Sequence, residues 1–462
     1  MRPRASRRPR PGSRGVSAPA PVAVVGAGPA GLAAARALAA RALAGRGVAF
    51  EVLERHDDVG GIWDLSNPGT PMYASAHFIS SKGVSGFSGF PMPDAYPDYP
   101  DRRLILAYLR AFADRYDLRR HVRFGTEVVR AEQAAGGKWT VTAGDGSERR
   151  YSALVCANGV TWTPNIPDLP GTFAGEVSHA NTYRSTDEFR GRRVLVVGGG
   201  NSGVEIACDA ARAAEKAFIS LRRGYRFVPK HVFSVPTSEL FGEDGRPVAW
   251  PDWAGELASM DALLDGLVGD LTRLGLQAPD HDAFASHPIM NTRVLDHVAH
   301  GDLTPKGDVA GLDGEEIVFA GGSRETVGLV ILATGYRHDA PFLRAPRLVM
   351  NGGRPALHLN IFPPGVHDLY FIGFVEFAAG AYPHFDRMAR LVAEVLASGA
   401  GGRDAVRSLH VGYRPDTSGG RSFVSSDRRA NYVDAHAYAH AIEGAIERVR
   451  TGVPSSSNRE AA

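Results

Sequence analysis

The chain has 462 residues, 44% of them hydrophobic and 22% charged, a balance typical of a globular protein long enough for two or three cores. Its formal net charge of +2 excludes the strong field expected of a protein that binds nucleic acid or an anionic membrane surface. The two cysteines, Cys156 and Cys208, lie far apart and belong to no metal-ligand pattern, so we expect a reducing, cytoplasmic compartment and no metal site. No apolar run reaches the roughly 20 residues that a membrane helix needs.

The two ends of the chain differ in composition from the rest. Residues 1–20 carry several arginines among Pro, Ser and Gly, and they lack the apolar core of a secretory signal. Such a segment buries too little apolar surface to order itself, so we expect a disordered extension rather than a basic arm or a targeting segment. Residues 451–462 are expected to form a disordered tail for the same reason.

A glycine-rich turn near the N-terminus predicts a dinucleotide site. Residues 22–25 read as a buried parallel strand, the turn G-A-G-P-A-G follows, and an Ala-rich helix runs to about residue 44. In such a βαβ unit the glycines permit the tight turn and the close approach of a pyrophosphate, and the helix N-terminus attracts the phosphates. The next strand, residues 48–53, ends in an acid placed to accept hydrogen bonds from ribose hydroxyls. The residues expected to bind are Gly26, Gly28, Pro29, Ala30, Gly31, Glu54 and Arg55.

A second glycine-rich turn follows the strand at residues 193–197. It reads G-G-G-N-S-G and precedes a helix to about residue 214, and the strand after that helix, residues 217–221, ends in two arginines rather than an acid. An acid there would repel a 2′-phosphate, whereas arginine can bind it with charge-assisted hydrogen bonds, so NADPH is favoured over NADH. The alternative interpretation is a solvated basic corner. The residues expected to bind are Gly198, Gly200, Asn201, Ser202, Gly203, Ser220, Arg222 and Arg223.

The segment between the two turns, residues 173–184, reads F-x-G-x-x-x-H-x-x-x-Y-R. Taken alone, it predicts a polar loop with one histidine, which is commonly a solvated side chain. Together with the flanking turns, it resembles the fingerprint of the flavin-containing monooxygenases, which use FAD, NADPH and dioxygen. The resemblance covers nearly all of residues 21–450. It places His179 and Tyr183 where the FAD and NADPH domains join, and we expect these candidate catalytic residues to hold the domains in register rather than to transfer protons.

The resemblance also assigns roles to shorter segments. Residues 60–63, GGIW, match a segment that passes close to FAD, and residues 333–336, ATGY, match the link from the NADPH domain back to the FAD domain. In flavoproteins with two dinucleotide folds, the strand ending near residue 157 and the strand–helix junction after residue 369 lie beside the flavin. The implied cofactor-binding residues are Gly60, Gly61, Ile62, Trp63, Val128, Ala157, Asn158, Gly159, Thr334, Gly335, Tyr336, Gly373 and Glu376.

One loop departs from the family pattern near the reactive edge of the flavin. Many members carry Asn there, and alignment on Lys82 and the FPMP run at residues 90–93 puts Ile79 at that position. An isoleucine side chain cannot donate a hydrogen bond, so the polar contact is missing or another side chain supplies it. His77, Ser80 and Ser81 are the local candidates, and Ile79, His77 and Ser80 complete the candidate catalytic set.

The order of these segments predicts an α/β fold with two Rossmann-like dinucleotide-binding domains, the NADPH domain being inserted into a discontinuous FAD domain. We expect the FAD domain over residues 21–185 and 330–450 and the NADPH domain over residues 186–329. The segment around Trp250 and Trp253 predicts helices packed between the domains. The substrate is expected in the cleft between the domains, against the flavin.

The chemistry that the resemblance implies belongs to the cofactors. NADPH reduces FAD, the reduced flavin and dioxygen give a C4a-hydroperoxide, and a nitrogen or sulfur atom of a small molecule takes the distal oxygen. This route needs no protein nucleophile, and the sequence carries no Ser-His-Asp or Cys-His signature. We expect dioxygen and a small molecule as partners, with neither nucleic acid nor membrane, and the assembly is left open between a monomer and a homodimer.

Three alternatives remain open at this point. A Baeyer–Villiger monooxygenase uses the same cofactors to oxygenate ketones, but its fingerprint typically carries Trp where this chain has Tyr183. A disulfide reductase needs a paired dithiol, which two distant cysteines do not supply. A non-catalytic redox sensor would keep the NADPH turn but need not keep the FAD turn, the GGIW segment and the fingerprint together.

Overall fold

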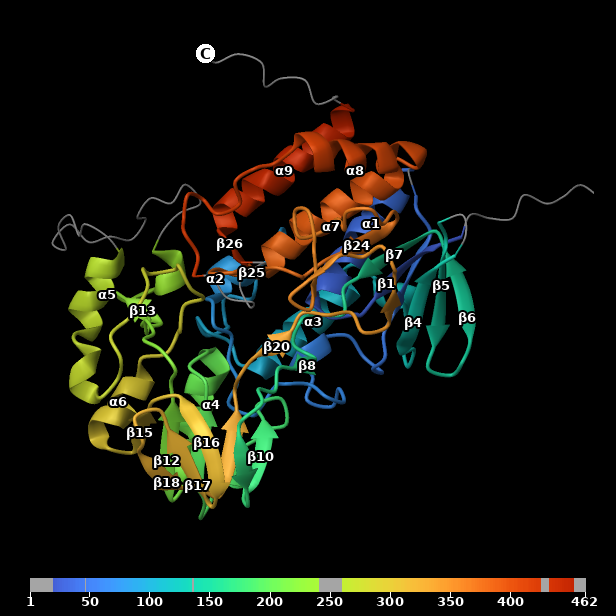
Figure 1. Ribbon diagram of the computed structural model, residues 1–462. Helices are drawn as coiled ribbons and strands as arrows, with labels where there is room; N and C mark the ends of the chain where they lie inside the picture. The colour runs from blue at the N-terminus through green and yellow to red at the C-terminus, as the bar shows by residue number, and fades with distance from the viewer. Residues whose placement is uncertain (1–19, 46, 135–136, 241–259, 425–431, 453–462) are drawn as a thin grey trace, which may run out of the picture.

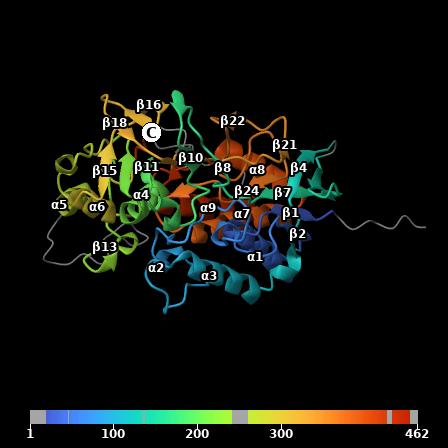
Figure 2. The same cartoon turned by 90° about the horizontal axis from the view of Figure 1, so that it is seen from below.

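Two α/β units lie side by side, the first around strand β1 (Val22–Val25) and the second around strand β11 (Arg193–Val197) (Figures 1 and 2). The predictions of helices around Trp250 and Trp253 and of disorder in most of the two ends concern residues outside the described part of the chain. The computed structural model describes residues 20–45, 47–134, 137–240, 260–424 and 432–452.

The first unit is built on a parallel sheet whose strands follow the order β24–β7–β1–β2–β3. The central strand β1 pairs with β2 and β7, so that Val24 lies between Val52 and Val155. Every residue of β1 and of β7 is buried, as expected for parallel strands that are covered on both faces. The strands beside β1 are β2 (Phe50–Leu53), β3 (Val122–Arg123), β7 (Ala153–Cys156) and β24 (Leu369–Phe371).

The side chains of β1 alternate between two cores, because successive residues of a strand point to opposite faces of the sheet. Val22 and Val24 pack with helices, whereas Ala23 and Val25 pack with a small mixed sheet of order β21–β4–β5–β6. On the helical face α1 packs against α7, which also contacts α8 and α9 (Figure 1). These elements are α1 (Pro29–Leu43), α3 (Arg102–Arg115), α7 (Tyr382–Ala397), α8 (Ala400–Gly412), α9 (Ala435–Thr451), β4 (Val128–Gln133), β5 (Trp139–Ala143), β6 (Glu148–Tyr151) and β21 (Leu343–Arg344).

The second unit repeats this plan with a parallel sheet of order β10–β19–β11–β12–β15. Val194 and Val196 face helix α4, while Leu195 and Val197 face a small sheet of order β18–β17–β16–β9. Its elements are β9 (Gly171–Phe173), β10 (Glu176–His179), α4 (Asn201–Ala213), β12 (Lys216–Ser220), α5 (Met260–Val268), α6 (Arg293–His300), β15 (Leu303–Lys306), β16 (Val309–Gly314), β17 (Glu316–Phe319), β18 (Arg324–Thr326) and β19 (Leu329–Leu332).

Two chain segments, called links below, connect the units and lie side by side. Strand β8 (Thr163–Pro164) lies in the link from the first unit to the second. It pairs antiparallel with β20 (Tyr336–Arg337), which lies in the link from the second unit back to the first. The fingerprint strand β10 and strand β19 both belong to the second sheet, so we propose that the domain borders follow these links rather than residues 185 and 330. The remaining short elements are α2 (Lys82–Ser85), β13 (His231–Val232), β14 (Val235–Pro236), β22 (Met350–Asn351), β23 (Arg354–Pro355), β25 (Glu376–Phe377) and β26 (Tyr432–Val433).

The predicted fold class is confirmed, since one parallel α/β unit is inserted into another and each carries a glycine-rich turn after a buried strand. The third glycine of each turn packs its helix against the turn itself. A Cβ atom on Gly31 would lie 1.8 Å from the carbonyl oxygen of Gly26, and a Cβ atom on Gly203 would lie 2.1 Å from that of Gly198. No side chain larger than hydrogen fits at either position without a backbone shift.

This contact yields a stability prediction. Gly31→Ala should lower the free energy of unfolding by about 1–3 kcal/mol, because the methyl group forces the helix away from the turn. The matched control is Gly401→Ala in α8, where a Cβ atom would meet no atom within 4 Å. The control should stay within about 0.5 kcal/mol of the parent. Urea unfolding of the three proteins measures the difference, and equal stability of both variants would contradict the packing role.

Candidate functional site

A cavity of about 790 Å³ lies between the two units, and both glycine-rich turns face it. Most residues that the sequence singled out line this cavity, although they come from segments more than 300 residues apart. Those that line it are Gly26, Gly28, Pro29, Ala30, Glu54, Arg55, Gly61, Ile62, Trp63, His77, Ile79, Ser80, Val128, Ala157, Asn158, Gly159, His179, Gly200, Asn201, Ser202, Gly203, Gly335, Tyr336, Gly373 and Glu376.

The other predicted residues do not line the cavity. Gly60 and Gly198 adopt φ values of 123° and 120°, which favour glycine, and support the turns from behind. Thr334 donates its hydroxyl to the carbonyl oxygen of Asn165, which fixes the returning link to the outgoing one. The predicted residues outside the cavity lining are Gly31, Gly60, Tyr183, Gly198, Ser220, Arg222, Arg223 and Thr334.

Each turn presents an uncapped helix N-terminus to the cavity. Gly28 is the residue before α1 and Gly200 the residue before α4, and at neither position does a side chain of the described residues cap the helix. The first N–H groups of a helix lack partners within it, and the helix dipole places partial positive charge at the same end. Both ends are therefore suited to a phosphate or pyrophosphate group.

Glu54 lies at the end of β2 and is only 5% exposed. Its carboxylate accepts the backbone N–H of Ala27 at 2.6 Å and that of His56 at 2.9 Å, which ties the end of the strand to the first turn. A carboxylate offers about four lone-pair positions, so it can accept further hydrogen bonds from a ligand in the cavity. The guanidinium of the neighbouring Arg55 lies 4.0 Å from the ring centroid of Trp162, and both residues line the cavity.

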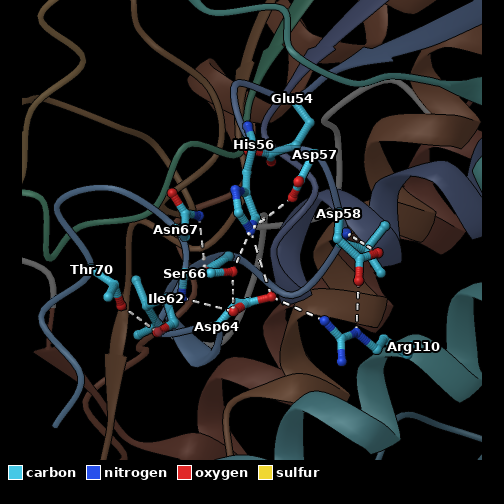
Figure 3. A network of polar contacts seen from close by, with 12 residues as sticks. Glu54, His56, Asp57, Asp58, Ile62, Asp64, Ser66, Asn67, Thr70 and Arg110 are labelled. Carbon is cyan, nitrogen blue, oxygen red and sulfur yellow. Dashed lines mark hydrogen bonds and ion pairs between the residues drawn. The ribbon is translucent and has the colours of Figure 1, made fainter.

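A polar network holds the GGIW segment in place beneath Glu54 (Figure 3). Asn67 donates its amide to the carbonyl oxygen of Gly61 at 3.0 Å, and Thr70 donates its hydroxyl to that of Ile62 at 2.5 Å. These bonds fix the backbone of the segment and leave the side chain of Ile62 on the cavity wall. The sequence analysis missed both donors, because short polar residues after a glycine turn carry no distinctive spacing.

The same network continues through Asp64 to helix α3 (Figure 3). Ser66 donates to Asp64 at 2.7 Å, Arg110 donates to Asp64 at 3.0 Å, and His56 contacts both Ser66 and Asp64. Burial alone would raise the pKa of Asp64, but the hydrogen bonds from Ser66 and the charge of Arg110 lower it below its usual value. The carboxylate therefore stays ionised and keeps its donors at neutral pH.

The three residues predicted to bind a 2′-phosphate have different surroundings. Ser220 is buried and donates its hydroxyl to the carbonyl oxygen of Gly307 at 2.8 Å, so this donor is already used inside the second unit. Arg223 contacts His281 at 3.2 Å and Asp280 at 3.7 Å. Arg222 is exposed and makes no hydrogen bond or ion pair with any residue that the structure describes. Arg222 is therefore the arginine of this pair that is available to an incoming anion.

His179 joins the fingerprint strand to the ATGY link. Its Nε2–H donates to the carbonyl oxygen of Gly335 at 3.1 Å, and its Nδ1 accepts the backbone N–H of Asn181 at 3.2 Å. These two contacts select the neutral ring with the proton on Nε2. Burial lowers the pKa of His179, which agrees with a neutral ring. Nδ1 also lies 3.1 Å from the side-chain Oδ1 of Asn181, so both nitrogens already face polar groups of the protein, and the positioning role of His179 stays a prediction.

Buried polar contacts between the units meet at two carboxyl groups of α4, one of which Tyr183 holds from within the second unit. The hydroxyl of Tyr183 donates to Asp209 Oδ2 on α4 at 2.9 Å, and Ser75, from the first unit, donates to the same oxygen. Tyr73 of the first unit donates to Glu205 at 2.6 Å. Burial raises the pKa of Glu205, a carboxyl that also lines the cavity. Tyr73, Glu205 and Asp209 were not predicted, because the bonds between the units join residues far apart in the sequence: Tyr73 and Glu205 are 132 positions apart, and Ser75 and Asp209 are 134 apart.

The loop that departs from the family pattern also reaches the cavity. Ile79 packs against an apolar cluster of the second unit that includes Val228 and Met290, which explains an apolar residue at this position. His77 is exposed and donates from Nδ1 to the carbonyl oxygen of Ser75 at 2.8 Å, which leaves Nε2 for another contact. Ser80 is 9% exposed and its hydroxyl pairs with that of Ser85 at 2.8 Å.

Two further searches concern other kinds of site. Among the described residues, no group of three or more His, Cys, Asp or Glu side chains is placed to hold a metal ion. Of the helices in the described ranges, none combines the length and the apolar composition needed to cross a membrane.

Comparison with known proteins places these features in context. A family model described as "Flavin-binding monooxygenase-like" matches residues 20–241 and 266–401. Flavin-containing monooxygenase 5 of Homo sapiens is 29% identical over 399 residues, which cover 81% of this chain and 73% of the relative. The probable indole-3-pyruvate monooxygenase YUCCA9 of Arabidopsis thaliana is 30% identical over 368 residues, which cover 76% of this chain and 84% of the relative.

Solved structures share the fold at lower sequence identity. A flavin-containing monooxygenase from Stenotrophomonas maltophilia superposes with a TM-score of 0.62 at 24% identity, covering 82% of this chain and 98% of the other. An oxidized steroid monooxygenase bound to NADP superposes with a TM-score of 0.68 at 21% identity, covering 95% of this chain and 99% of the other. At these identities the likeness concerns the fold.

The junction between the units gives a second prediction. Tyr183→Phe keeps the ring but removes a buried hydroxyl that donates to Asp209, so the free energy of unfolding should fall by about 1–3 kcal/mol. The matched control is Tyr116→Phe, because the hydroxyl of Tyr116 makes no hydrogen bond with a described residue. That variant should change stability by less than about 0.5 kcal/mol. Urea unfolding distinguishes them, and a Tyr183→Phe protein as stable as the control would contradict the junction role.

Proposed function

This chain belongs to the flavin-binding monooxygenase-like family, and we propose that it uses NADPH and dioxygen to insert one oxygen atom at the nitrogen or sulfur of a small molecule. Family membership confirms the prediction made from the two turns and the fingerprint, and with it the flavin cofactor and the monooxygenase class. The observation that carries the proposal is that two uncapped helix N-termini face one cavity.

The residues present fit two dinucleotides. The turn at Gly26 and the carboxylate of Glu54 would hold the pyrophosphate and ribose of FAD, while the turn at Gly198 and Arg222 would hold NADPH. When bound, FAD supplies the chemistry, because it takes electrons from NADPH and passes them to dioxygen. Two solved structures that share this fold, a cyclohexanone monooxygenase and a steroid monooxygenase, contain bound NADP, which supports the assignment of the second turn.

The chain's own residues bind, orient and exclude water. Trp63 and Phe78 contact each other with ring centroids 5.2 Å apart, and Phe78 contacts Tyr382 at 5.4 Å, so this part of the cavity wall is a continuous apolar surface. An apolar wall keeps water from a reactive intermediate and strengthens the remaining polar contacts. His179 fixes the distance between the link and the fingerprint strand, and with it the position of one nucleotide relative to the other.

Oxygenation at nitrogen or sulfur is favoured over oxygenation of ketones by two observations. Tyr183 occupies the fingerprint position where Baeyer–Villiger enzymes typically carry Trp, and curated relatives include a dimethylaniline monooxygenase described as N-oxide-forming, from Macaca mulatta. Ketone oxygenation is the second candidate, because cyclohexanone monooxygenase superposes on this chain with a TM-score of 0.67 at 17% identity.

The proposal is tested with purified protein, NADPH, ¹⁸O-labelled dioxygen and three matched substrates, a tertiary amine, a thioether and a cyclic ketone. Mass spectrometry should find one ¹⁸O atom in an N-oxide or a sulfoxide, with NADPH consumed in proportion. A labelled lactone or ester as the main product would select ketone oxygenation instead. Protein that binds FAD but labels none of the three would contradict the proposed activity.

Arg222 yields a prediction on nucleotide choice. Arg222→Ala should weaken NADPH binding by about tenfold or more and leave NADH binding unchanged, because each charged hydrogen bond is worth about 1.5–3 kcal/mol. Arg120→Ala, on the surface of the first unit, is the matched loss of charge. Titration of both nucleotides with each protein measures the effect. If NADPH and NADH weakened equally in Arg222→Ala, the 2′-phosphate assignment would be wrong.

His179 yields a prediction on rate. His179→Ala removes both backbone contacts of the ring, so we expect slower flavin reduction by NADPH and more hydrogen peroxide released per NADPH, at near-normal FAD content. Stopped-flow absorbance, a peroxide assay and the visible spectrum provide the three measurements. Wild-type reduction with full coupling would show that the fingerprint strand is an ordinary connection. A pH dependence of the wild-type reduction rate near the pKa of histidine that disappears in His179→Ala would assign proton transfer instead.

A further inference from the structure

One part of the cavity wall carries hydrogen-bond acceptors and lacks matching donors among the described residues. Asn158 donates its amide nitrogen to the carbonyl oxygens of Gly159 at 3.2 Å and of Asp339 at 3.1 Å. Both partners are acceptors, so the orientation of the amide is fixed and its oxygen is the atom left over. This Oδ1 atom is buried and has no hydrogen-bond partner in the described part of the chain.

The next residue of this wall is His338, which adjoins Asp339 and is 3% exposed. Its Nε2 lies 3.1 Å from Oε1 of Glu376, another cavity residue. An ionised carboxylate only accepts hydrogen bonds, so Nε2 carries a proton, and in the ring with a single proton Nδ1 is an acceptor. Nδ1 is buried and likewise meets no donor among the described residues.

We propose that Oδ1 of Asn158 and Nδ1 of His338, whose ring Glu376 orients, form an acceptor patch that binds an N–H or O–H group of a molecule held in the cavity. Buried polar atoms are nearly always paired, and each unpaired acceptor on this wall is satisfied when a ligand supplies a donor. The inference rests on the proposed function, and it adds a specificity determinant to the apolar wall. The donor has two sources, the imide N–H of the flavin ring or a hydroxyl or N–H group of the substrate.

The experiment uses the holoenzyme and two thioethers that differ in one group, 2-(methylthio)ethanol and its O-methyl ether. If the patch binds the substrate, the wild-type kcat/KM should favour the alcohol by about tenfold or more, because the ether cannot donate. In His338→Phe, which keeps a ring but removes both nitrogens, this preference should disappear. Glu376→Gln, which keeps the shape of the side chain and replaces one acceptor with a donor, should reduce the preference in the same direction.

If the patch binds the flavin instead of the substrate, we expect different results from the same proteins. The wild type should then treat the two thioethers alike, and His338→Phe should lose FAD on gel filtration and show a shifted visible absorption spectrum. The matched control is His384→Phe in α7, since His384 is also buried with an unpartnered Nδ1 but does not line the cavity. The control should keep the FAD content, the spectrum and the substrate ratio of the wild type.

The inference is overturned if His338→Phe and Glu376→Gln keep the wild-type FAD content, spectrum and substrate ratio. It is also overturned if His384→Phe changes them equally, because the effect would then be general to buried histidines. Failure of the proposed function is a separate result, in which the wild type oxygenates neither thioether. The patch is then judged by FAD content and by binding of the two thioethers, read from the flavin spectrum.

Discussion

The contact between each helix and its own glycine turn is the constraint on which the rest of this structure depends. A Cβ atom on Gly31 or Gly203 would fall within 2.1 Å of a backbone carbonyl oxygen, so both helices begin as close to their strands as a backbone allows. That closeness leaves the first N–H groups of α1 and α4 facing outward from the carboxyl ends of two parallel sheets. Because the links β8 and β20 pair with each other, the two sheets present those ends to one cavity rather than to opposite sides of the molecule.

The units meet through buried polar contacts, and this has a consequence for precision. Tyr183 and Ser75 share one oxygen of Asp209, and Tyr73 bonds to Glu205 one turn earlier on α4. Apolar surfaces can slide against each other at a small cost in free energy. A buried hydrogen bond, in contrast, is lost when its donor and acceptor move apart by a fraction of an ångström. Contacts of this kind therefore set the register between the units, and electron transfer between two bound cofactors depends steeply on such a register.

The features that the sequence predicted are those encoded in one short stretch of chain. Each nucleotide turn belongs to a stretch of about 30 residues that contains a buried strand, the glycine turn, a helix and the residue at the end of the next strand. Each turn and the order of the domains could therefore be derived without knowledge of distant contacts. The hydrogen-bond partners of single side chains could not be derived in this way. They are brought together by pairing between strands that lie far apart in the sequence. Ser220 bonds to Gly307 only because β12 pairs with β15, and His338 meets Glu376 only after the chain has crossed back into the first unit. Ile79 departs from the family pattern for a similar reason, since its apolar neighbours belong to the second unit.

The strands that follow the two turns are succeeded by side chains of opposite charge, and we propose that this difference gives the two turns different ligands. In the first unit the residue after β2 is Glu54, which already bonds to its own turn and would repel a phosphate on the adjacent ribose. In the second unit strand β12 ends at Ser220, which matches Leu53, so Leu221 takes the place of Glu54 and Arg222 comes one residue later. Arg222 is exposed and would attract that phosphate. A fold that repeats one plan twice must distinguish two dinucleotides that share the adenosine half. The charge at the end of the second strand makes that distinction without any change in the turns, because the pyrophosphate contacts are common to both ligands. On this proposal the preference for NADPH would reside in the surface side chain of Arg222, while the capacity to bind a dinucleotide would reside in the backbone.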